Sequence, residues 1–165
     1  MSLTVAMSDA TRARFEREIA KYPPDQKQSA VMACLTIVQK ERGYVSRASE
    51  DEVAAYLGMA PIAVYEVTTF YNMYNQQPVG KFKINVCTNL PCQLRDGQQA
   101  IAHICAKLGV AVGGTTADGQ FTVQQSECLG ACADAPVMLV NDREMISFMS
   151  NDRIDDLLAT LAAAK

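Results

Sequence analysis

Hydrophobic and polar positions follow two different periods along the chain. In the first half, apolar residues recur every three or four positions, which is typical of helices with one buried face. After the segment NQQPVG, stretches such as KFKINVC instead alternate apolar and polar residues, which is typical of strands. We therefore expect an α+β chain, with a bundle of helices at residues 1–77 and an α/β domain at residues 78–165.

The helices of the first half are delimited by turn and capping residues. The first is expected to end before the two consecutive prolines, and the second to run from Asp25 to a stop at Gly43. Ser49 and Glu52 have the spacing of a capping box for a third helix. Pro61 is placed to open a fourth helix.

The second half predicts the element order β-α-β-β-β-α. Its first strand is residues 81–87, and one long helix is expected to follow from Pro91 to Leu108. Three further strands are predicted in DGQFTVQQ, VMLV and EMISFM, and a final amphipathic helix closes the chain. Strands joined through a helix are normally parallel. Their carboxyl ends then meet at one edge of the sheet, where ligand sites of such sheets usually lie.

Four cysteines fall at this expected edge. One pair, spaced C-x₄-C, begins where the first strand ends, and the other pair, spaced C-x₃-C, follows the second strand by a few residues. The two remaining cysteines, Cys34 and Cys105, lie on the apolar stripes of their helices and are expected to fill the core. The candidate ligands are Cys87, Cys92, Cys128 and Cys132.

Composition narrows the chemistry open to these thiols. The chain has 165 residues, 49% of them hydrophobic and 20% charged, so a core can form without cross-links. The amino-terminal residues do not resemble a secretory signal, and the longest apolar stretch is too short to span a bilayer. We expect a cytoplasmic protein, in which thiols stay reduced. Metal binding or catalysis is therefore favoured over disulfides.

Spacing alone leaves two metal sites open. Four thiolates can hold a tetrahedral structural zinc or a [2Fe–2S] cluster. Gly130, between the two cysteines of the second pair, allows the backbone there to turn its N–H groups toward a sulfur. Cys92 is expected in the opening turn of the long helix, at the positive end of the dipole. Both features suit an anionic cluster and would also help a zinc site.

Two other functions fit less well. Thioredoxin-type exchange uses cysteines two residues apart, whereas four residues separate Cys87 from Cys92. The first half has the outline of a DNA-binding helix-turn-helix, but Ala48 to Gly80 contains no Lys or Arg and the net charge is -3. We therefore expect no nucleic-acid partner and no direct insertion into a membrane.

A few charged residues near the sheet have ordinary expected roles. Lys81, Lys83 and Arg95 are predicted to form a solvated face that is also available to an acidic partner. His103, the only histidine, is predicted to be a surface residue without a ligand-like partner.

The motifs VCTNLPCQLR and SECLGACADAPVML resemble those of the thioredoxin-like [2Fe–2S] ferredoxin family. Within it, they and TFYNMY are similar to the E subunit of bacterial NADH-quinone oxidoreductases, the respiratory complex I branch. Asp96-Gly97 differs from the Arg-Gly common in that branch. The gamma subunits of NAD-dependent formate dehydrogenases and NAD-reducing hydrogenases share the cysteine pattern and remain an alternative.

The resemblance implies a thioredoxin-like second domain and one [2Fe–2S] cluster, with Cys87, Cys92, Cys128 and Cys132 as its ligands. It also implies a chain that is not catalytic alone and that exchanges electrons with the FMN of a partner, the NADH-oxidising F subunit. Other peripheral-arm subunits of complex I would be further partners. The location implied is the cytoplasmic side of the inner membrane, as a peripheral part of the complex.

Overall fold

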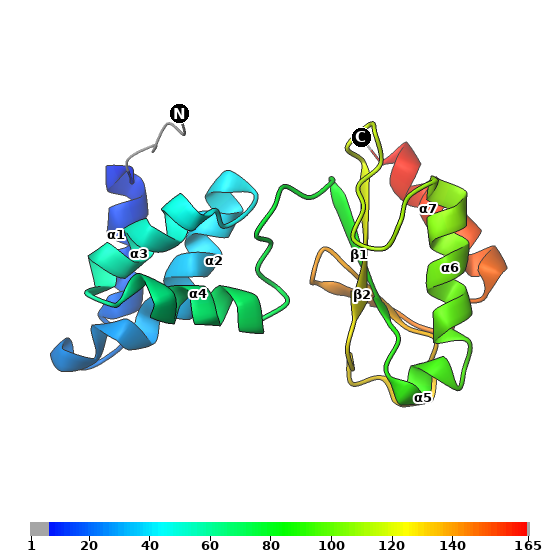
Figure 1. Cartoon of the computed structure of the whole chain (residues 1–165), viewed down its shortest axis with the longest axis horizontal. Helices are drawn as coiled ribbons and strands as arrows, with labels where there is room; N and C mark the ends of the chain where they lie inside the picture. The colour runs from blue at the N-terminus through cyan, green and yellow to red at the C-terminus, as the bar shows by residue number, and fades with distance from the viewer. Residues whose placement is uncertain (1–6, 165) are drawn as a thin grey trace. The chain divides into compact units, whose positions relative to one another are not determined.

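The computed structural model describes residues 7–164, which divide into two compact units with the boundary between Pro78 and Val79. The first unit is helical and the second contains the sheet (Figure 1). Within residues 7–164, no helix combines the length and apolar character needed to cross a lipid bilayer.

The first unit contains one 3-10 helix and the helices α1 to α4. Ser8 caps the first α-helix, because its hydroxyl oxygen accepts a hydrogen bond from the Thr11 backbone N–H at 3.1 Å. The expected second helix is divided, since its start adopts 3-10 geometry and only the part after Ala30 is α-helical. The bounds are α1 Asp9–Ile19, η1 Pro24–Ala30, α2 Val31–Arg42, α3 Arg47–Leu57 and α4 Pro61–Phe70.

The predicted capping box of the third helix is wrong. The cap is Ser46, three residues earlier, and its hydroxyl accepts from the Ser49 backbone N–H at 3.2 Å. Ser49 is instead a buried helical residue, and Glu52 forms an ion pair with Arg42 at 2.7 Å. The Ser49 hydroxyl instead accepts a hydrogen bond from the Arg42 guanidinium of α2 at 2.8 Å.

The helical unit encloses its own apolar core. Phe15, Leu35 and Leu57 from three helices are fully buried in it, and Phe15 stacks edge-on against Tyr56 at 5.3 Å between ring centroids. Cys34 is also fully buried there, as expected, and burial raises the pKa of its thiol to about 12. A thiol in this state is inert packing.

The second unit is a mixed sheet with the strand order β2-β1-β3-β4. Strands β1 and β2 are parallel, and β3 and β4 join the other side of β1 in antiparallel fashion. Helices α6 and α7 lie together against one face of the sheet (Figure 1). The bounds are β1 Phe82–Cys87, α5 Leu90–Gln93, α6 Gly97–Leu108, β2 Phe121–Ser126, η2 Cys132–Asp134, β3 Met138–Val140, β4 Glu144–Ile146 and α7 Asn151–Ala163.

The predicted element order is confirmed, but the predicted long helix from Pro91 to Leu108 is two helices. Asp96 has a φ of 67°, in the left-handed region, and this ends the first helical turn before α6 begins. The next residue is a buried glycine because a Cβ at Gly97 would lie 2.8 Å from the carbonyl oxygens of Cys87 and Cys92. The break therefore allows α6 to approach the cysteine-bearing segment closely.

The expectation that Lys83 lies on a solvated face is also wrong. Its side chain is only 2% exposed, and its Nζ lies 2.5 Å from a carboxylate oxygen of Asp142. The other oxygen of Asp142 accepts a hydrogen bond from the Asn85 amide at 2.7 Å. The β3–β4 turn thus brings a carboxylate to the side of β1 opposite its apolar residues, and both faces of this strand are buried.

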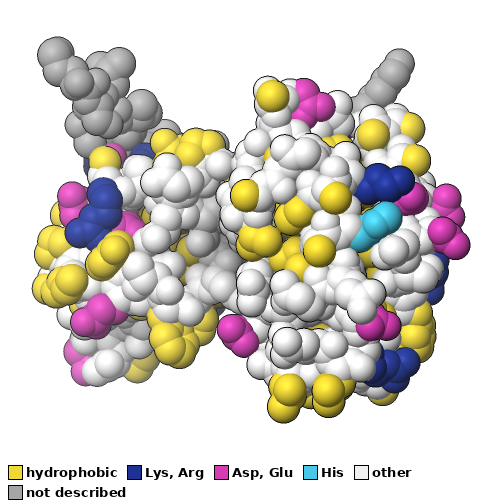
Figure 2. All heavy atoms as spheres, turned by 45° about the vertical axis from the view of Figure 1, so that its right-hand side comes forward, with side chains coloured by type: hydrophobic (Ala, Val, Ile, Leu, Met, Phe, Trp, Pro, Cys, Tyr) yellow, Lys and Arg dark blue, Asp and Glu magenta, His cyan; other side chains and the backbone are white. Residues whose placement is uncertain are grey.

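His103 has a charged partner that the sequence did not indicate. Its Nε2 lies 2.8 Å from Asp155, and Lys107 donates to the same carboxylate at 2.6 Å. The three side chains link α6 to α7 on the outside of the unit, where the histidine is cyan in Figure 2.

Candidate metal centre

Two bends carry the candidate cysteines: the first bend carries Cys87 and Cys92, and the second bend carries Cys128 and Cys132. The parallel strand pair sets where both bends begin. Cys87, the last residue of β1, is paired with Ser126, the last residue of β2. Just beyond, the Thr88 N–H donates to the Ser126 carbonyl at 3.1 Å, and Cys128 follows two residues later. Both bends therefore leave the same edge of the sheet, as the β-α-β order predicts.

The first bend is closed by the short helix α5. The Cys87 N–H donates to the Val137 carbonyl at 3.1 Å, which fixes the end of the strand. Leu90 starts the helix and Pro91 lies in its first turn. The Gln93 N–H donates to the Asn89 carbonyl at 2.9 Å, and Cys92 is turned inward and is 1% exposed. The helix has only four residues, so the expected dipole of a long helix does not act on Cys92.

The second bend is organised by a glycine. Gly130 has a φ of 79°, and its N–H donates to the Cys128 sulfur at 3.4 Å, so the predicted turn of the backbone toward a sulfur is confirmed. A single 3-10 turn starting at Cys132 follows, in which the Asp134 N–H donates to the Ala131 carbonyl at 3.0 Å. The Cys132 thiol of this bend is close enough to the first bend for the charge of Cys87 to act on it.

Two side-chain hydrogen bonds join the bends directly. The Asn89 amide donates to the Glu127 carboxylate at 3.2 Å, next to Cys128. The Arg95 guanidinium donates to the Ala133 carbonyl at 3.2 Å, next to Cys132. Arg95 was expected only on a solvated face, and the sequence gives no signal for its link to a residue 38 positions away.

The four thiols differ in their exposure to solvent. Cys87 and Cys92 are each 1% exposed, whereas Cys132 is partly exposed and Cys128 is exposed. Ala135 and Val137 are buried with the inner pair, and Leu129 packs against them. Sequence reasoning missed this apolar wall, although the hydrophobic run after the second bend is its signal.

Electrostatics connect the thiols to one another. Burial, followed by a hydrogen bond with Cys87, raises the pKa of Cys92 to about 11, and a backbone hydrogen bond from Val137 opposes that rise. A hydrogen bond with Cys128 raises the pKa of Cys132, and the charge of Cys87 adds to it. The apolar, thiol-rich surroundings thus favour protonated thiols, and a bound cation would reverse this preference.

The structure places the four cysteines in two neighbouring pairs. Cys87 raises the pKa of Cys92, Cys128 raises the pKa of Cys132, and the charge of Cys87 also raises the pKa of Cys132, in the other pair. All four are free thiols. Within residues 7–164, no three His, Cys, Asp or Glu side chains already stand in a metal-ligating arrangement. The donor set is soft thiolate sulfur, which fits zinc and iron–sulfur clusters.

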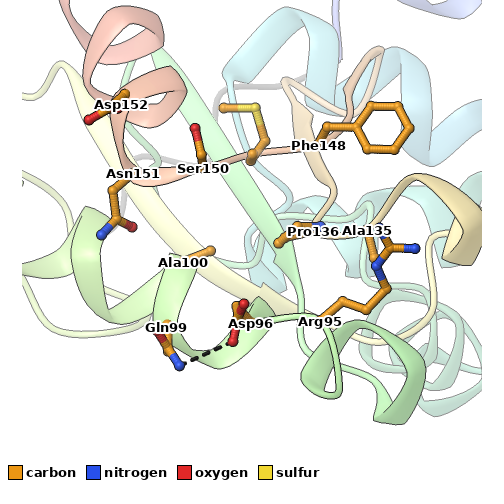
Figure 3. A pocket seen from close by; sticks show the side chains of 11 residues that line it. Arg95, Asp96, Gln99, Ala100, Ala135, Pro136, Phe148, Ser150, Asn151 and Asp152 are labelled. Atoms are coloured by element: carbon orange, nitrogen blue, oxygen red, sulfur yellow. Dashed lines mark hydrogen bonds between the residues drawn. The ribbon is translucent and has the colours of Figure 1, made fainter.

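A cavity of about 470 Å³ lies beside the bends (Figure 3). Arg95 and Phe148 line one side of it, and Asn151 and Asp152, at the start of α7, line the other. The Asp96 carboxylate at its base accepts a hydrogen bond from the Gln99 amide at 3.1 Å. Two apolar side chains of α5 and its C-cap are exposed: Leu90 is 64% and Leu94 is 78% exposed.

The sequence of the chain is similar to a known protein family and to two named relatives. The family model of the thioredoxin-like [2Fe–2S] ferredoxins matches residues 15–162. The second NADH-quinone oxidoreductase E subunit of Rhizobium meliloti is 39% identical over 154 residues, which cover 93% of this chain and 90% of the relative. The NADH-quinone oxidoreductase E subunit of Rickettsia conorii is 46% identical over 129 residues, 77% of each chain.

A solved structure shares the fold. The NAD⁺-reducing [NiFe]-hydrogenase in its H₂-reduced state superposes with a TM-score of 0.69 at 22% sequence identity. The match covers 82% of this chain and 22% of the hydrogenase chain.

Proposed function

The chain belongs to the thioredoxin-like [2Fe–2S] ferredoxin family, and on this premise we propose that it is the [2Fe–2S] electron-transfer subunit, the E subunit, of an NADH-quinone oxidoreductase. In this role it exchanges electrons with the FMN of the NADH-oxidising F subunit. The observation that carries the proposal is the meeting of two thiol-bearing bends at one sheet edge, in a chain 39% identical to an E subunit over 93% of its length.

Cys87, Cys92, Cys128 and Cys132 would hold the cluster, which supplies a one-electron carrier when bound. The exposure of the thiols supports this assignment, because the buried inner pair excludes water and the exposed Cys128 leaves one side open to a partner. The Gly130 N–H near the Cys128 sulfur and the nearby Arg95 guanidinium are suited to an anionic group.

This proposal assigns a different role to each of the two units. Residues 78–165 form the cluster domain, and residues 1–77 form a helical domain that docks on neighbouring peripheral-arm subunits. The sequence has no dinucleotide-binding fingerprint, so FMN and NADH belong to the partner. The complex would hold the chain on the cytoplasmic side of the inner membrane, with no span of its own.

A second candidate is the corresponding gamma subunit of an NAD-dependent formate dehydrogenase or NAD-reducing hydrogenase. The shared fold with an NAD⁺-reducing hydrogenase supports it. The two relatives named as E subunits are 39% and 46% identical, against 22% for the hydrogenase, and this favours the quinone-linked complex. Identification of the chains that co-purify with a tagged copy from its own cells distinguishes the two.

The ligand assignment is tested by substitution in anaerobically reconstituted protein. Cys92→Ser and Cys128→Ser should each abolish or alter the visible absorption and the EPR signal of the dithionite-reduced protein, because each removes one thiolate ligand. The matched controls Cys34→Ala and Cys105→Ala should retain both signals. Colour lost in a control, or a colourless wild-type protein that binds one zinc, would overturn the assignment.

A further inference from the structure

A hollow of about 420 Å³ lies between α1 and α2 of the helical unit, and the proposed function does not use it. Two contacts show that the helices run in opposite directions. The Thr11 hydroxyl, near the start of α1, donates to Glu41, near the end of α2, at 2.7 Å. The charge of Glu18, near the end of α1, raises the pKa of Cys34, near the start of α2. The hollow therefore follows a groove between antiparallel helices. Its lining residues are Arg14, Arg17, Glu18, Ala33, Thr36, Ile37 and Lys40.

The groove gathers positive charge that the described chain does not neutralise. Arg14, Arg17 and Lys40 line it, and within residues 7–164 none of the three forms an ion pair. The one carboxylate at the groove, Glu18, lies 2.5 Å from the ammonium group of Lys21. The sequence before residue 7, MSLTVA, contains no acidic side chain.

Two other arginines of the same unit do have carboxylate partners. Arg42 pairs with Glu52 at 2.7 Å, and Arg47 pairs with the buried Glu50 at 3.0 Å. Three cations left around one concave surface instead match a ligand that brings its own negative charge.

The shape of the groove selects the kind of anion. Arg14 and Arg17 are about one helical turn apart, roughly 4.5 Å along the axis of α1, and Lys40 faces them from α2. Ala33 and Ile37 line the same groove and give it apolar surface. An extended polypeptide with carboxylates interspersed with aliphatic side chains matches this lining, since guanidinium groups bind carboxylates in a planar fork and the apolar surface can contact the aliphatic groups.

We propose that this groove, lined by Arg14, Arg17 and Lys40, docks an acidic segment of another protein. The inference goes beyond electron transfer and involves none of the four candidate ligand cysteines. The helical unit thereby gains a contact that is set by charge and is sensitive to salt.

The test uses the full-length chain with its metal site reconstituted. The probe is the acetylated, amidated hexapeptide Glu-Leu-Glu-Glu-Leu-Asp, with Gln-Leu-Gln-Gln-Leu-Asn as its uncharged match, and binding is followed by ¹⁵N NMR shifts and calorimetry. We expect only the acidic peptide to bind, with amides of α1 and α2 shifting, and affinity to fall at least about fivefold between 50 and 200 mM NaCl.

Variants separate the groove from the general charge of the protein. The triple variant R14Q/R17Q/K40Q should weaken peptide binding about tenfold or more, about 1.4 kcal/mol. The control K27Q/K81Q/R143Q removes the same number of positive charges elsewhere and should change affinity less than twofold. Both should keep the wild-type circular dichroism and cluster absorbance, so that a failed docking site is not confused with a failed metal site.

Three outcomes would overturn the proposal. Equal weakening in the control variant would show that net charge alone attracts the peptide. Tight binding of inorganic pyrophosphate at the same amides, without peptide binding, would identify a small-anion site. A dimer in sedimentation that dissociates only in R14Q/R17Q/K40Q would identify a second copy of this chain as the occupant.

Discussion

The guanidinium of Arg95 donates to the carbonyl oxygen of Ala133 at 3.2 Å, and these two residues follow Cys92 and Cys132 by three positions and one position. This bond ties the two thiol-bearing bends together from outside. Inside, the same bends share an apolar wall with Ala135 and Val137. A metal group held between them would therefore depend for its stability on residues that do not themselves bind it.

Arg95→Gln should loosen the site without removing a ligand. The shorter, neutral side chain loses the link to Ala133 and the positive charge near an anionic cluster, so we expect the cluster to be released about tenfold faster. The measurement is the decay of visible absorbance in the presence of a chelator. Arg143→Gln removes an equal charge from the β3–β4 turn and is the control. Equal decay rates would show that Arg95 has no such role.

Gly97→Ala should disturb the first bend through its backbone. A Cβ at this position would lie 2.8 Å from the carbonyl oxygens of Cys87 and Cys92, so α6 must move away from the bend. We expect a loss of about 1–3 kcal/mol in the unfolding free energy of the sheet unit. Gln98→Ala, the exposed next residue, should be nearly neutral in the same urea titration. A neutral Gly97→Ala would mean that the contact is not tight in solution.

The two partners of the buried ion pair between Lys83 and Asp142 should differ in how much their replacement destabilises the fold. Asp142→Asn leaves a buried ammonium without its carboxylate and should lower the free energy of unfolding by about 3 kcal/mol. Lys83→Met replaces the charge with an apolar chain and should lower it by less. Urea unfolding followed by circular dichroism measures both. All six tyrosines lie in the helical unit, so tyrosine fluorescence should be unaffected and serves as an internal control. Equal costs would contradict the argument.

The contact between α6 and α7 should weaken in acid. Hydrogen bonds from Lys107, and then from His103, lower the pKa of Asp155 below its usual value of 3.8. Because the folded state binds this proton less readily than the unfolded state, the stabilisation is complete above pH 3.8. It is lost as the pH falls through the lower folded value. Melting temperatures between pH 6 and pH 2.5 should therefore drop less steeply in Asp155→Asn than in Asp156→Asn.

The parts of the fold that the sequence predicted correctly depend on local periodicity. Alternation in residues 81–87 and helical spacing around Ile101 and Ile104 each reflect one buried face, and both elements formed as expected. One error lies where a distant residue decides: Lys83 was predicted to face solvent, but the β3–β4 turn brings Asp142 to it. Another is local: Asp96 was predicted to be helical, but its φ of 67° separates the first helical turn from α6.

The sequence also predicted some features of the candidate site and not others. The spacing of the cysteines and the β-α-β order were enough to place two thiol pairs at one edge, because parallel strands expose their carboxyl ends together. Spacing could not give the buried inner pair and exposed outer thiol, or the links from Asn89 and Arg95 to the second bend, since these join residues 38 positions apart. The chain alone thus placed the four candidate thiols at one edge of the sheet. Their depth, their neighbours and the groove between α1 and α2 were decided only by tertiary packing, because burial and charge pairing are properties of surfaces that meet after folding.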